Sequence, residues 1–483
     1  MHRILPKQGQ SSERNCCIIT DFSNWKEKTL LKHAERVKAC RNKGETMGGN
    51  YISQTLLWTL IGLCYPYLGS AQEAPISDAV KKEIPGIVKI YQELHANPEL
   101  SFQEYRTAAF LAKELRALKF EVREKIGRTG VVGVLKNGDG PKVLVRTDMD
   151  ALPVLENTGL AFASKMVAKN EKGQDTGVMH ACGHDVHMTA WLGIARIFSA
   201  NRTNWKGTLI LIAQPAEEIG LGAKAMLEDG LYKDFPKPDF ALALHCDAFR
   251  PTGTIGVCEG VACANVDSVD IVVKGRGGHG ASPHNAVDPI VLAARIILDL
   301  QTLVSREINP LDPAVVTVGS IQGGTKHNII PAEVRLQITV RSMKDSVRKH
   351  LLEGIARIAR TAAEGARAPA PTVLVRQEEF TPMLSNNVPL TQRLRKVWES
   401  KLGREFVSAR EPVMGGEDFS RYAQGGVPVC MFFLGTVPKE KWAKQQGMSL
   451  PSLHSEFFYP AMPTTVETGV EAMRLAVLEL MQP

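Results

Sequence analysis

The sequence predicts an α/β protein with two domains, in which a central and mostly parallel sheet is flanked by helices. Its 483 residues are more than one typical core organises. Apolar runs of strand length recur from about residue 141, and acidic residues or histidines follow them. After about residue 265 the pattern changes to strand, helix, two strands, helix and strand, the order of a ferredoxin-like unit. We therefore expect a second, inserted domain.

Four apolar runs are expected to form strands of the central sheet. They begin near Pro141, Gly207, Pro238 and Val427. In open α/β sheets, ligands bind beyond the carboxyl ends of the strands, so the polar side chains that follow these runs should gather at one site. Those side chains are Asp148 and Asp150, Glu217 and Glu218, His245, and His454 with Glu456.

The adjacent carboxylates of Glu217 and Glu218 are the most informative of these side chains. In extended backbone, neighbouring side chains point to opposite sides, so one carboxylate can hold a metal while the other faces a bound water. A ligand that fixes the ion and a base that accepts the proton are the minimum for metal-assisted hydrolysis. Taken alone, the pair favours a solvated loop, and the neighbouring motifs change that interpretation.

The segment His180–His187 contains three histidines and one cysteine within eight residues of a chain that has 12 histidines. We expect Cys182 and His184 to lie on extended backbone and to project to the same side, so that both reach one ion. Thiolate and imidazole suit zinc, and manganese or cobalt can also fill such a site.

Residues 266–380 are expected to form a separate domain with its own core. Because none of its predicted strands ends in Asp, Glu, His or Cys, we interpret this domain as an inserted lid. The lid would divide the catalytic domain into residues 72–265 and 381–483. Hydrophobic periodicity predicts lid strands at 266–274, 314–321, 333–341 and 371–376, and lid helices at 289–304 and 345–363.

Seven motifs follow one another along the chain: Arg146–Pro153, His180–Asp185, Gln214–Glu218, Gly277–Pro283, His327–Pro331, Gly415–Phe419 and Leu453–Glu456. In this order they resemble the amidohydrolase branch of the aminoacylase and carboxypeptidase G superfamily of metallopeptidases. The branch includes hippurate hydrolase, bacterial N-acyl-amino-acid amidohydrolases and plant hydrolases of indoleacetyl-amino-acid conjugates. The resemblance extends from about Ile84 to the C-terminus, without a departure at a ligand position.

The resemblance implies two divalent metal ions per subunit, of which the identity (zinc, manganese or cobalt) stays open. Glu217 matches the general base of the family. Asp150 matches the carboxylate that orients a metal ligand without binding the metal itself. The positions that match the metal ligands are Cys182, His184, Glu218, His245 and His454.

Other polar residues of these motifs receive weaker expectations. Asp148 and Asp185 can each orient a ligand from behind. His180 and His187 are expected to pack or hydrogen-bond, not to bind metal. The motif residues that receive no role are Glu417 and Glu456.

Three lid residues match substrate-binding positions of the family. Arg341 ends a predicted lid strand, and an arginine fork matches a carboxylate bidentately. His279 and Asn328 carry donors that can stabilise the oxyanion of a tetrahedral intermediate. The alternative for Arg341 is a solvated strand residue, and the alternative for His279 is a loop histidine. The resemblance also implies a homodimer in which the lid packs against a second subunit.

The activity implied is metal-dependent hydrolysis of the amide bond of N-acyl amino acids, which gives a carboxylic acid and a free amino acid. A di- or carboxypeptidase on the same scaffold is the nearest alternative, and the cysteine-containing motif favours the amidohydrolase. A non-catalytic binding protein with this fold is the third interpretation. Retention of Glu217 and of all five ligand positions argues against it.

The N-terminal region predicts export to the periplasm or the medium. Residues 51–71 resemble the apolar part of a signal peptide with a small-residue cleavage site before Gln72. Pro66 makes the apolar run too short for a spanning helix, so no membrane insertion is expected after processing. We interpret 47–71 as the signal and 1–46 as a leader that precedes a true start at Met47.

The net charge of +7 does not indicate a nucleic-acid partner. The leader alone carries ten Lys and Arg against five Asp and Glu, a net +5, which leaves +2 for the rest of the chain. The nine cysteines show no disulfide-scaffold spacing. We expect mostly core thiols, although Cys258 and Cys263 could pair in an exported protein.

Overall fold

The structure of the protein is a computed structural model that describes residues 74–170, 172–444 and 450–482. The expected leader and signal peptide lie outside these residues. The described residues belong to one compact unit. Within the described ranges, no helix is both long and apolar enough to span a lipid bilayer.

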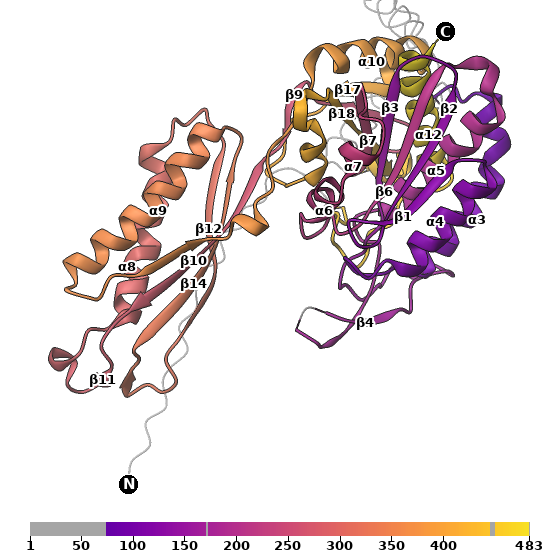
Figure 1. The fold of residues 1–483 in the computed structure, drawn as a ribbon. Helices are drawn as coiled ribbons and strands as arrows, with labels where there is room; N and C mark the ends of the chain where they lie inside the picture. The colour runs from indigo at the N-terminus through magenta and orange to yellow at the C-terminus, as the bar shows by residue number, and fades with distance from the viewer. Residues whose placement is uncertain (1–73, 171, 445–449, 483) are drawn as a thin grey trace, which may run out of the picture. The chain divides into compact units, whose positions relative to one another are not determined.

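An eight-stranded sheet forms the centre of the larger domain (Figure 1). Its strand order is β1-β2-β6-β3-β7-β18-β8-β17. The four central strands β6, β3, β7 and β18 run parallel, while β1, β2 and β8 join antiparallel to their inner neighbours. The expected mostly parallel sheet is therefore confirmed. The strands are β1 (Glu121–Ile126), β2 (Gly130–Asn137), β3 (Lys142–Asp148), β6 (Gly207–Gln214), β7 (Phe240–Pro251), β8 (Ile255–Val257), β17 (Val407–Ala409) and β18 (Val429–Val437).

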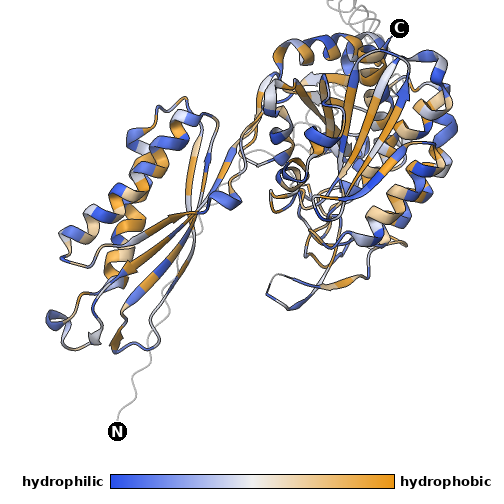
Figure 2. Cartoon of the chain, in the orientation of Figure 1, coloured by the Kyte–Doolittle hydropathy of each residue, from blue (hydrophilic) through white to orange (hydrophobic). Residues whose placement is uncertain are grey.

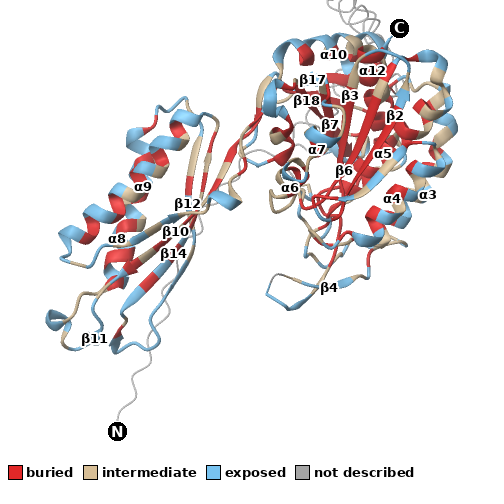
Figure 3. Cartoon of the chain, viewed as in Figure 1, coloured by how far each residue is buried: buried red, intermediate tan, exposed pale blue. Residues whose placement is uncertain are grey.

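Helices cover both faces of this sheet, because its central strands are apolar on both sides. In β6, Leu209 and Leu211 join one buried cluster, whereas Ile210 and Ile212 join the other. The strands are accordingly hydrophobic in Figure 2 and buried in Figure 3. The helices of this domain are α3 (Asp78–Ala96), α4 (Tyr105–Ala117), α5 (His184–Ala200), α6 (Gly222–Glu228), α7 (Leu231–Asp234), α10 (Val388–Lys401), α11 (Lys439–Lys444) and α12 (Thr464–Met481).

The lid has the expected β-α-β-β-α-β order. Its four strands pair antiparallel in the order β12-β14-β10-β15, and both helices pack against the apolar face of that sheet. Alternate residues of β14 are buried, as expected for a sheet covered on one face. The exact domain boundaries stay a prediction. The lid elements are β10 (Asn265–Lys274), α8 (Pro289–Thr302), β12 (Ala314–Gly323), β14 (Glu333–Ser342), α9 (Asp345–Gly365) and β15 (Thr372–Val375).

Short elements complete the described chain. Three two-stranded sheets pair β4 (Val167–Lys169) with β5 (Asp175–Gly177), β9 (Gly260–Cys263) with β16 (Leu384–Asn386), and β11 (Gly278–His279) with β13 (Ile329–Ile330). The 3-10 and π turns are Arg202–Asn204, Pro283–Asn285, Leu303–Glu307, Gln377–Glu379, Arg404–Phe406 and Asp418–Gly426.

Candidate active site

A cavity of about 890 Å³ lies at the carboxyl end of the parallel strands. Glu217 and Glu218 line it from the turn after β6, and His245 lines it from β7. One expectation was wrong here, because β7 does not end before His245 but continues to Pro251. Its pairing with β3 stops at Ala243, however, while its pairing with β18 continues. The pairing of β7 with β3 thus stops before His245, which lines the cavity.

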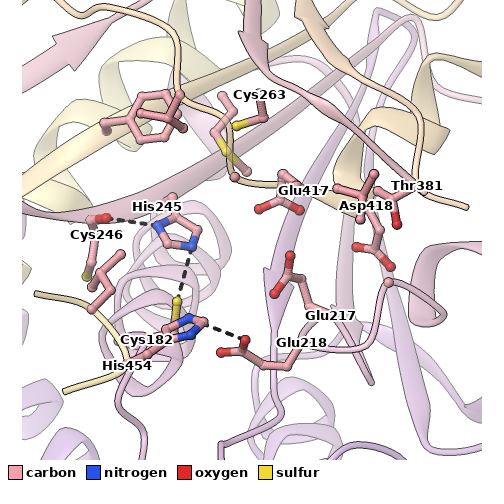
Figure 4. Close-up of a pocket in the computed structure, with 18 of the residues that line it drawn as sticks. Cys182, Glu217, Glu218, His245, Cys246, Cys263, Thr381, Glu417, Asp418 and His454 are labelled. Carbon is pink, nitrogen blue, oxygen red and sulfur yellow. Dashed lines mark hydrogen bonds and ion pairs between the residues drawn. The ribbon is translucent and has the colours of Figure 1, made fainter. Parts of the chain in front are cut away.

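Glu217 and Glu218 lie in a turn, not in the extended backbone that we expected. Ala216 has a positive φ of 49°, and the amide of Gly220 donates to the carbonyl of Glu217 at 2.7 Å. The two carboxylates nevertheless diverge: Figure 4 shows Glu218 directed toward His454, and Glu217 directed toward Glu417 and Asp418. The turn thus separates the two carboxylates, as the alternation of a strand would.

Cys182 and His184 also depart from the expected extended backbone. Gly183 between them adopts φ +83°, and His184 is the first residue of α5. A Cβ on Gly183 would lie 2.7 Å from the Cys246 sulfur, so this turn requires glycine. The turn still brings both side chains to one place: Cys182 Sγ lies 3.6 Å from His245 Nε2, and one ligand atom each from Cys182, His184 and His245 fits within 4.8 Å.

His454 reaches the same site from the loop before α12. Its backbone has a positive φ of 66° and its amide donates to the carbonyl of Ala181 at 2.8 Å. Its Nε2 lies 3.5 Å from a carboxylate oxygen of Glu218, and its side chain is 55% exposed. The five residues that match family ligands therefore lie together, and all of them except His184 line the cavity.

The donor atoms of this cluster fit a metal ion. His184 Nε2 and Glu218 Oε1 are buried, have no hydrogen-bond partner, and lie 3.7 Å apart. Two ligands at tetrahedral zinc lie about 3.4–3.6 Å apart, from bond lengths of about 2.0–2.3 Å. Since buried polar atoms are rarely left without a partner, these separations and orphaned atoms are those of a metal site.

Asp150 fixes two of the proposed ligands from behind. Its carboxylate accepts hydrogen bonds from the hydroxyl of Ser101 at 2.7 Å and from the amide of Glu218 at 3.0 Å. Its backbone carbonyl lies 2.8 Å from Nδ1 of His184. Because Nδ1 donates to that carbonyl, Nε2 of His184 is left as the electron-pair donor.

Both ring nitrogens of His187 form hydrogen bonds within the protein, so neither has a lone pair left for a metal ion. Its Nε2 accepts a hydrogen bond from the amide of Cys246 at 2.9 Å, and its Nδ1 therefore donates to Asp148 at 2.7 Å. His180 packs without a hydrogen-bond partner for either ring nitrogen, and burial lowers its pKa to about 4.

Asp185 faces away from the cluster, toward His95. Its carboxylate lies 2.7 Å from Nδ1 of His95, whose other nitrogen lies 3.0 Å from Glu156. Although burial lowers the pKa of His95, its two carboxylate partners raise it to about 10. Asp185 therefore ties the start of α5 to α3. The sequence motif alone did not reveal this partner.

A buried network around Arg146 lies next to Glu217. The guanidinium donates to Asp148 at 2.6 Å, to Glu417 at 2.9 Å and to Asp418 at 3.2 Å. Its Nε also donates to the side chain of Gln214 at 3.0 Å. Glu417, which received no role from the sequence, thus belongs to a set of three carboxylates around one cation.

The lid contributes Arg341 to the cavity lining, but not His279 or Asn328. Arg341 Nε donates to the hydroxyl of Thr339 at 3.1 Å, and among the described residues no carboxylate forms an ion pair with it. His279 and Asn328 lie side by side, because the amide of Gly280 donates to the carbonyl of Asn328 at 2.8 Å. His279 Nδ1 accepts from the amide of Ala281 at 3.0 Å, so its exposed Nε2 carries the proton.

The family model described as peptidase family M20/M25/M40 matches residues 144–479. The chain belongs to this family. It is a hydrolytic enzyme that acts on C–N bonds. Its M20 assignment agrees with the α/β fold and with the ligand clusters at the strand ends.

Individual relatives cover most of the chain. A protein named thermostable carboxypeptidase 2 from Saccharolobus solfataricus is 36% identical and covers 79% of this chain and 92% of its own. Hippurate hydrolase from Campylobacter jejuni is 38% identical, over 70% of this chain and 84% of its own. A solved structure, a dinuclear metal binding M20 peptidase from Bacillus subtilis, has a TM-score of 0.67 and 30% identity, over 83% of this chain and all of its own.

The M20 site concentrates negative charge around buried groups. Burial and the carboxylates of Glu417 and Glu218 raise the pKa of Glu217 well above its usual range. Burial also raises the pKa of the Cys182 thiol, and the carboxylates of Glu218 and Glu217 add to that effect. Burial lowers the pKa of His184, but Asp148 and the neighbouring acids raise it to about 10. The raised pKa values show that negative charge accumulates among these side chains when no cation is present. Divalent cations would stabilise such a cluster.

The five cysteines of the described chain, Cys182, Cys246, Cys258, Cys263 and Cys430, are all free thiols. The suggested pairing of Cys258 with Cys263 is therefore not formed.

Proposed function

We propose that this protein hydrolyses the amide bond of N-acyl amino acids to a carboxylic acid and a free amino acid. The observation that carries this proposal is the cluster of five donor side chains beside Glu217, with buried donor atoms that have no protein partner. The relative named hippurate hydrolase supports the substrate class.

Two divalent ions are the proposed cofactor. The residues that would hold them are Cys182, His184, Glu218, His245 and His454. The mixed sulfur, nitrogen and oxygen donor set suits zinc, and manganese or cobalt can also occupy it. When bound, such ions lower the pKa of water and polarise a carbonyl oxygen.

Glu217 is the proposed general base. Its carboxylate lines the cavity, lies 3.9 Å from His184 Nε2, and has no hydrogen-bond partner among the described residues. It would accept a proton from the attacking water and return that proton to the nitrogen that leaves. Asp150 would hold Glu218 and His184 in place during both transfers.

Metal content provides a direct test of the ligand set. Cys182→Ser should lower metal occupancy after dialysis, whereas the matched variant Cys246→Ser should retain it, because Cys246 is buried nearby but belongs to none of the ligand groups. His454→Ala should resemble Cys182→Ser. Elemental analysis measures the result, and full occupancy in either ligand variant would remove that residue from the set.

Arg341 is the proposed partner of the substrate carboxylate, because it lines the cavity without a carboxylate of its own. Arg341→Ala should reduce kcat/KM for N-acyl amino acids by about ten- to a hundredfold, the worth of a hydrogen bond to a charged group. The matching N-acyl amino-acid amides, which lack that charge, should lose far less. Equal losses for both substrates would make Arg341 a structural residue.

His279 and Asn328 are the proposed oxyanion donors. The free Nε2–H of His279 is suited to that role. Because neither residue lines the cavity, both would reach a carbonyl there only after a lid movement or from a second copy of the chain. His279→Ala should therefore slow N-acyl amino acids and their amides alike.

A panel of substrates tests the function itself. The metal-loaded protein should cleave N-acyl amino acids faster than dipeptides with a free amine. The opposite preference would favour the second candidate, a carboxypeptidase, which the Saccharolobus solfataricus relative supports by name. No cleavage of either class, at full metal occupancy, would contradict both.

Homodimerisation through the lid and export are further parts of the proposal. Sedimentation of the full chain and of a chain without the lid tests the first. The second expects the exported protein to begin at or near Gln72, and recovery of a chain that begins at Met1 in the cytosol would contradict it.

A further inference from the structure

A second arginine, Arg410, lines the same cavity as Arg341. It belongs to the catalytic domain, directly after β17, and its amide donates to the carbonyl of Val257 at 2.9 Å. One N-acyl amino acid with a single carboxylate needs only one of these two arginines. The position of Arg410 in the cavity lining therefore needs an explanation of its own.

The ring of Phe433 lies between the guanidinium of Arg410 and His245, one of the proposed metal ligands. The carbon of the guanidinium stacks 3.5 Å from the ring centroid of Phe433. Phe433 is the strand neighbour of His245 across β18 and β7, and the two rings lie 6.4 Å apart. The side chain of Arg410 is only 15% exposed, so its charge is held at the wall of the cavity and not in bulk solvent.

The protein does not neutralise this charge completely. Arg410 Nε donates to Asp247 at 3.1 Å, but the same carboxylate oxygen also faces Arg250 at 3.6 Å. One carboxylate is thus shared by two guanidinium groups, and the trio carries a net positive charge. Nη1 of Arg410 donates to the carbonyl of Glu411 at 3.3 Å, while Nη2 has no hydrogen-bond partner among the described residues.

We propose that Arg410 binds a second carboxylate of the substrate, so that the preferred substrates are N-acyl amino acids with one carboxylate beyond the α-carboxylate. This inference rests on the proposed function and narrows its substrate class. A partly buried guanidinium with an open donor and an incomplete counter-charge is suited to a carboxylate, and its stacking on Phe433 fixes its orientation. The second carboxylate would come from the acyl chain or from the side chain of the amino acid.

Isosteric substrate pairs distinguish these sources and test the proposal. N-succinyl-glycine and its terminal amide differ only in a carboxylate on the acyl chain. N-benzoyl-glutamate and N-benzoyl-glutamine differ only in a carboxylate on the amino acid. For one of the two pairs, the metal-loaded wild type should cleave the acid about ten- to a hundredfold better in kcat/KM than the amide, the range expected for a hydrogen bond to a charged group.

The ratio of acid to amide should fall by the same factor in Arg410→Gln, whatever the absolute rates, and Arg410→Lys should keep part of it. Arg404→Gln is the matched control, because it makes the same charge change at an exposed position outside the cavity lining, and it should leave the ratio unchanged. A thermal unfolding curve for each variant verifies folding.

Two results would overturn the proposal: a wild type that cleaves acid and amide equally in both pairs, or an Arg410→Gln variant that folds and keeps the preference. If the Arg410→Gln variant does not fold, the acid-to-amide ratio of kcat/KM in the wild type alone tests the proposal. Cleavage without discrimination contradicts only this inference, whereas no cleavage of any of the four substrates contradicts the proposed function.

Discussion

Replacing Glu217 by glutamine is expected to abolish turnover while metal content stays near that of the wild type. The side chain lines the cavity, diverges from Glu218, and has no hydrogen-bond partner among the described residues. Loss of a general base typically costs about 100- to 10,000-fold in rate, and more where the same group also returns the proton. Single-turnover kinetics and elemental analysis of the same preparation measure both quantities.

Glu218→Gln is the matched control for this prediction, since it makes the same chemical change one residue later. Glu218 Oε1 is buried without a hydrogen-bond partner and lies 3.7 Å from His184, so this variant should lose metal as well as activity. If Glu217→Gln lost its metal and Glu218→Gln kept it, the two roles would have to be exchanged.

The strand-end residues show what the sequence alone could predict. A run such as Lys142–Asp148 is recognisable because an apolar stretch ends in a carboxylate, and parallel strands bring such ends to one edge. His454 was expected after the apolar run near Val427, but a loop and not the end of a strand delivers it. The local backbone was predicted wrongly: Gly183 and Ala216 turn the chain with positive φ, and alternation rules do not apply in turns.

Contacts between segments that are far apart in the chain could not be predicted from the sequence. Arg146 meets Glu417 only because β3 and the turn after residue 417 are brought together by the sheet order. Likewise, the charge on Arg410 is interpretable only once Asp247 is found between two arginines. Sequence identifies residues with suitable chemistry, whereas partner and charge balance depend on tertiary packing.

The Arg146 network leads to the second large expected effect. Arg146 is fully buried and is the cation that three buried carboxylates, Asp148, Glu417 and Asp418, share. Arg146→Gln would remove the guanidinium that these acids share beside Glu217. Removing one partner of a buried ion pair typically costs about 3–5 kcal/mol, because the remaining charges stay desolvated.

Urea denaturation of the chelator-treated protein measures this cost. Lys169→Gln is the comparison for an exposed pair, because Lys169 and Asp175 are 2.7 Å apart but both largely exposed. Such surface pairs contribute about 0–1 kcal/mol. Arg146→Lys, which keeps the charge but loses the planar fork, should be intermediate. If Arg146→Gln destabilised the protein no more than Lys169→Gln, the three carboxylates would have to be protonated in the folded state. Arg146 would then be a hydrogen-bond donor to neutral acids and not their counter-ion.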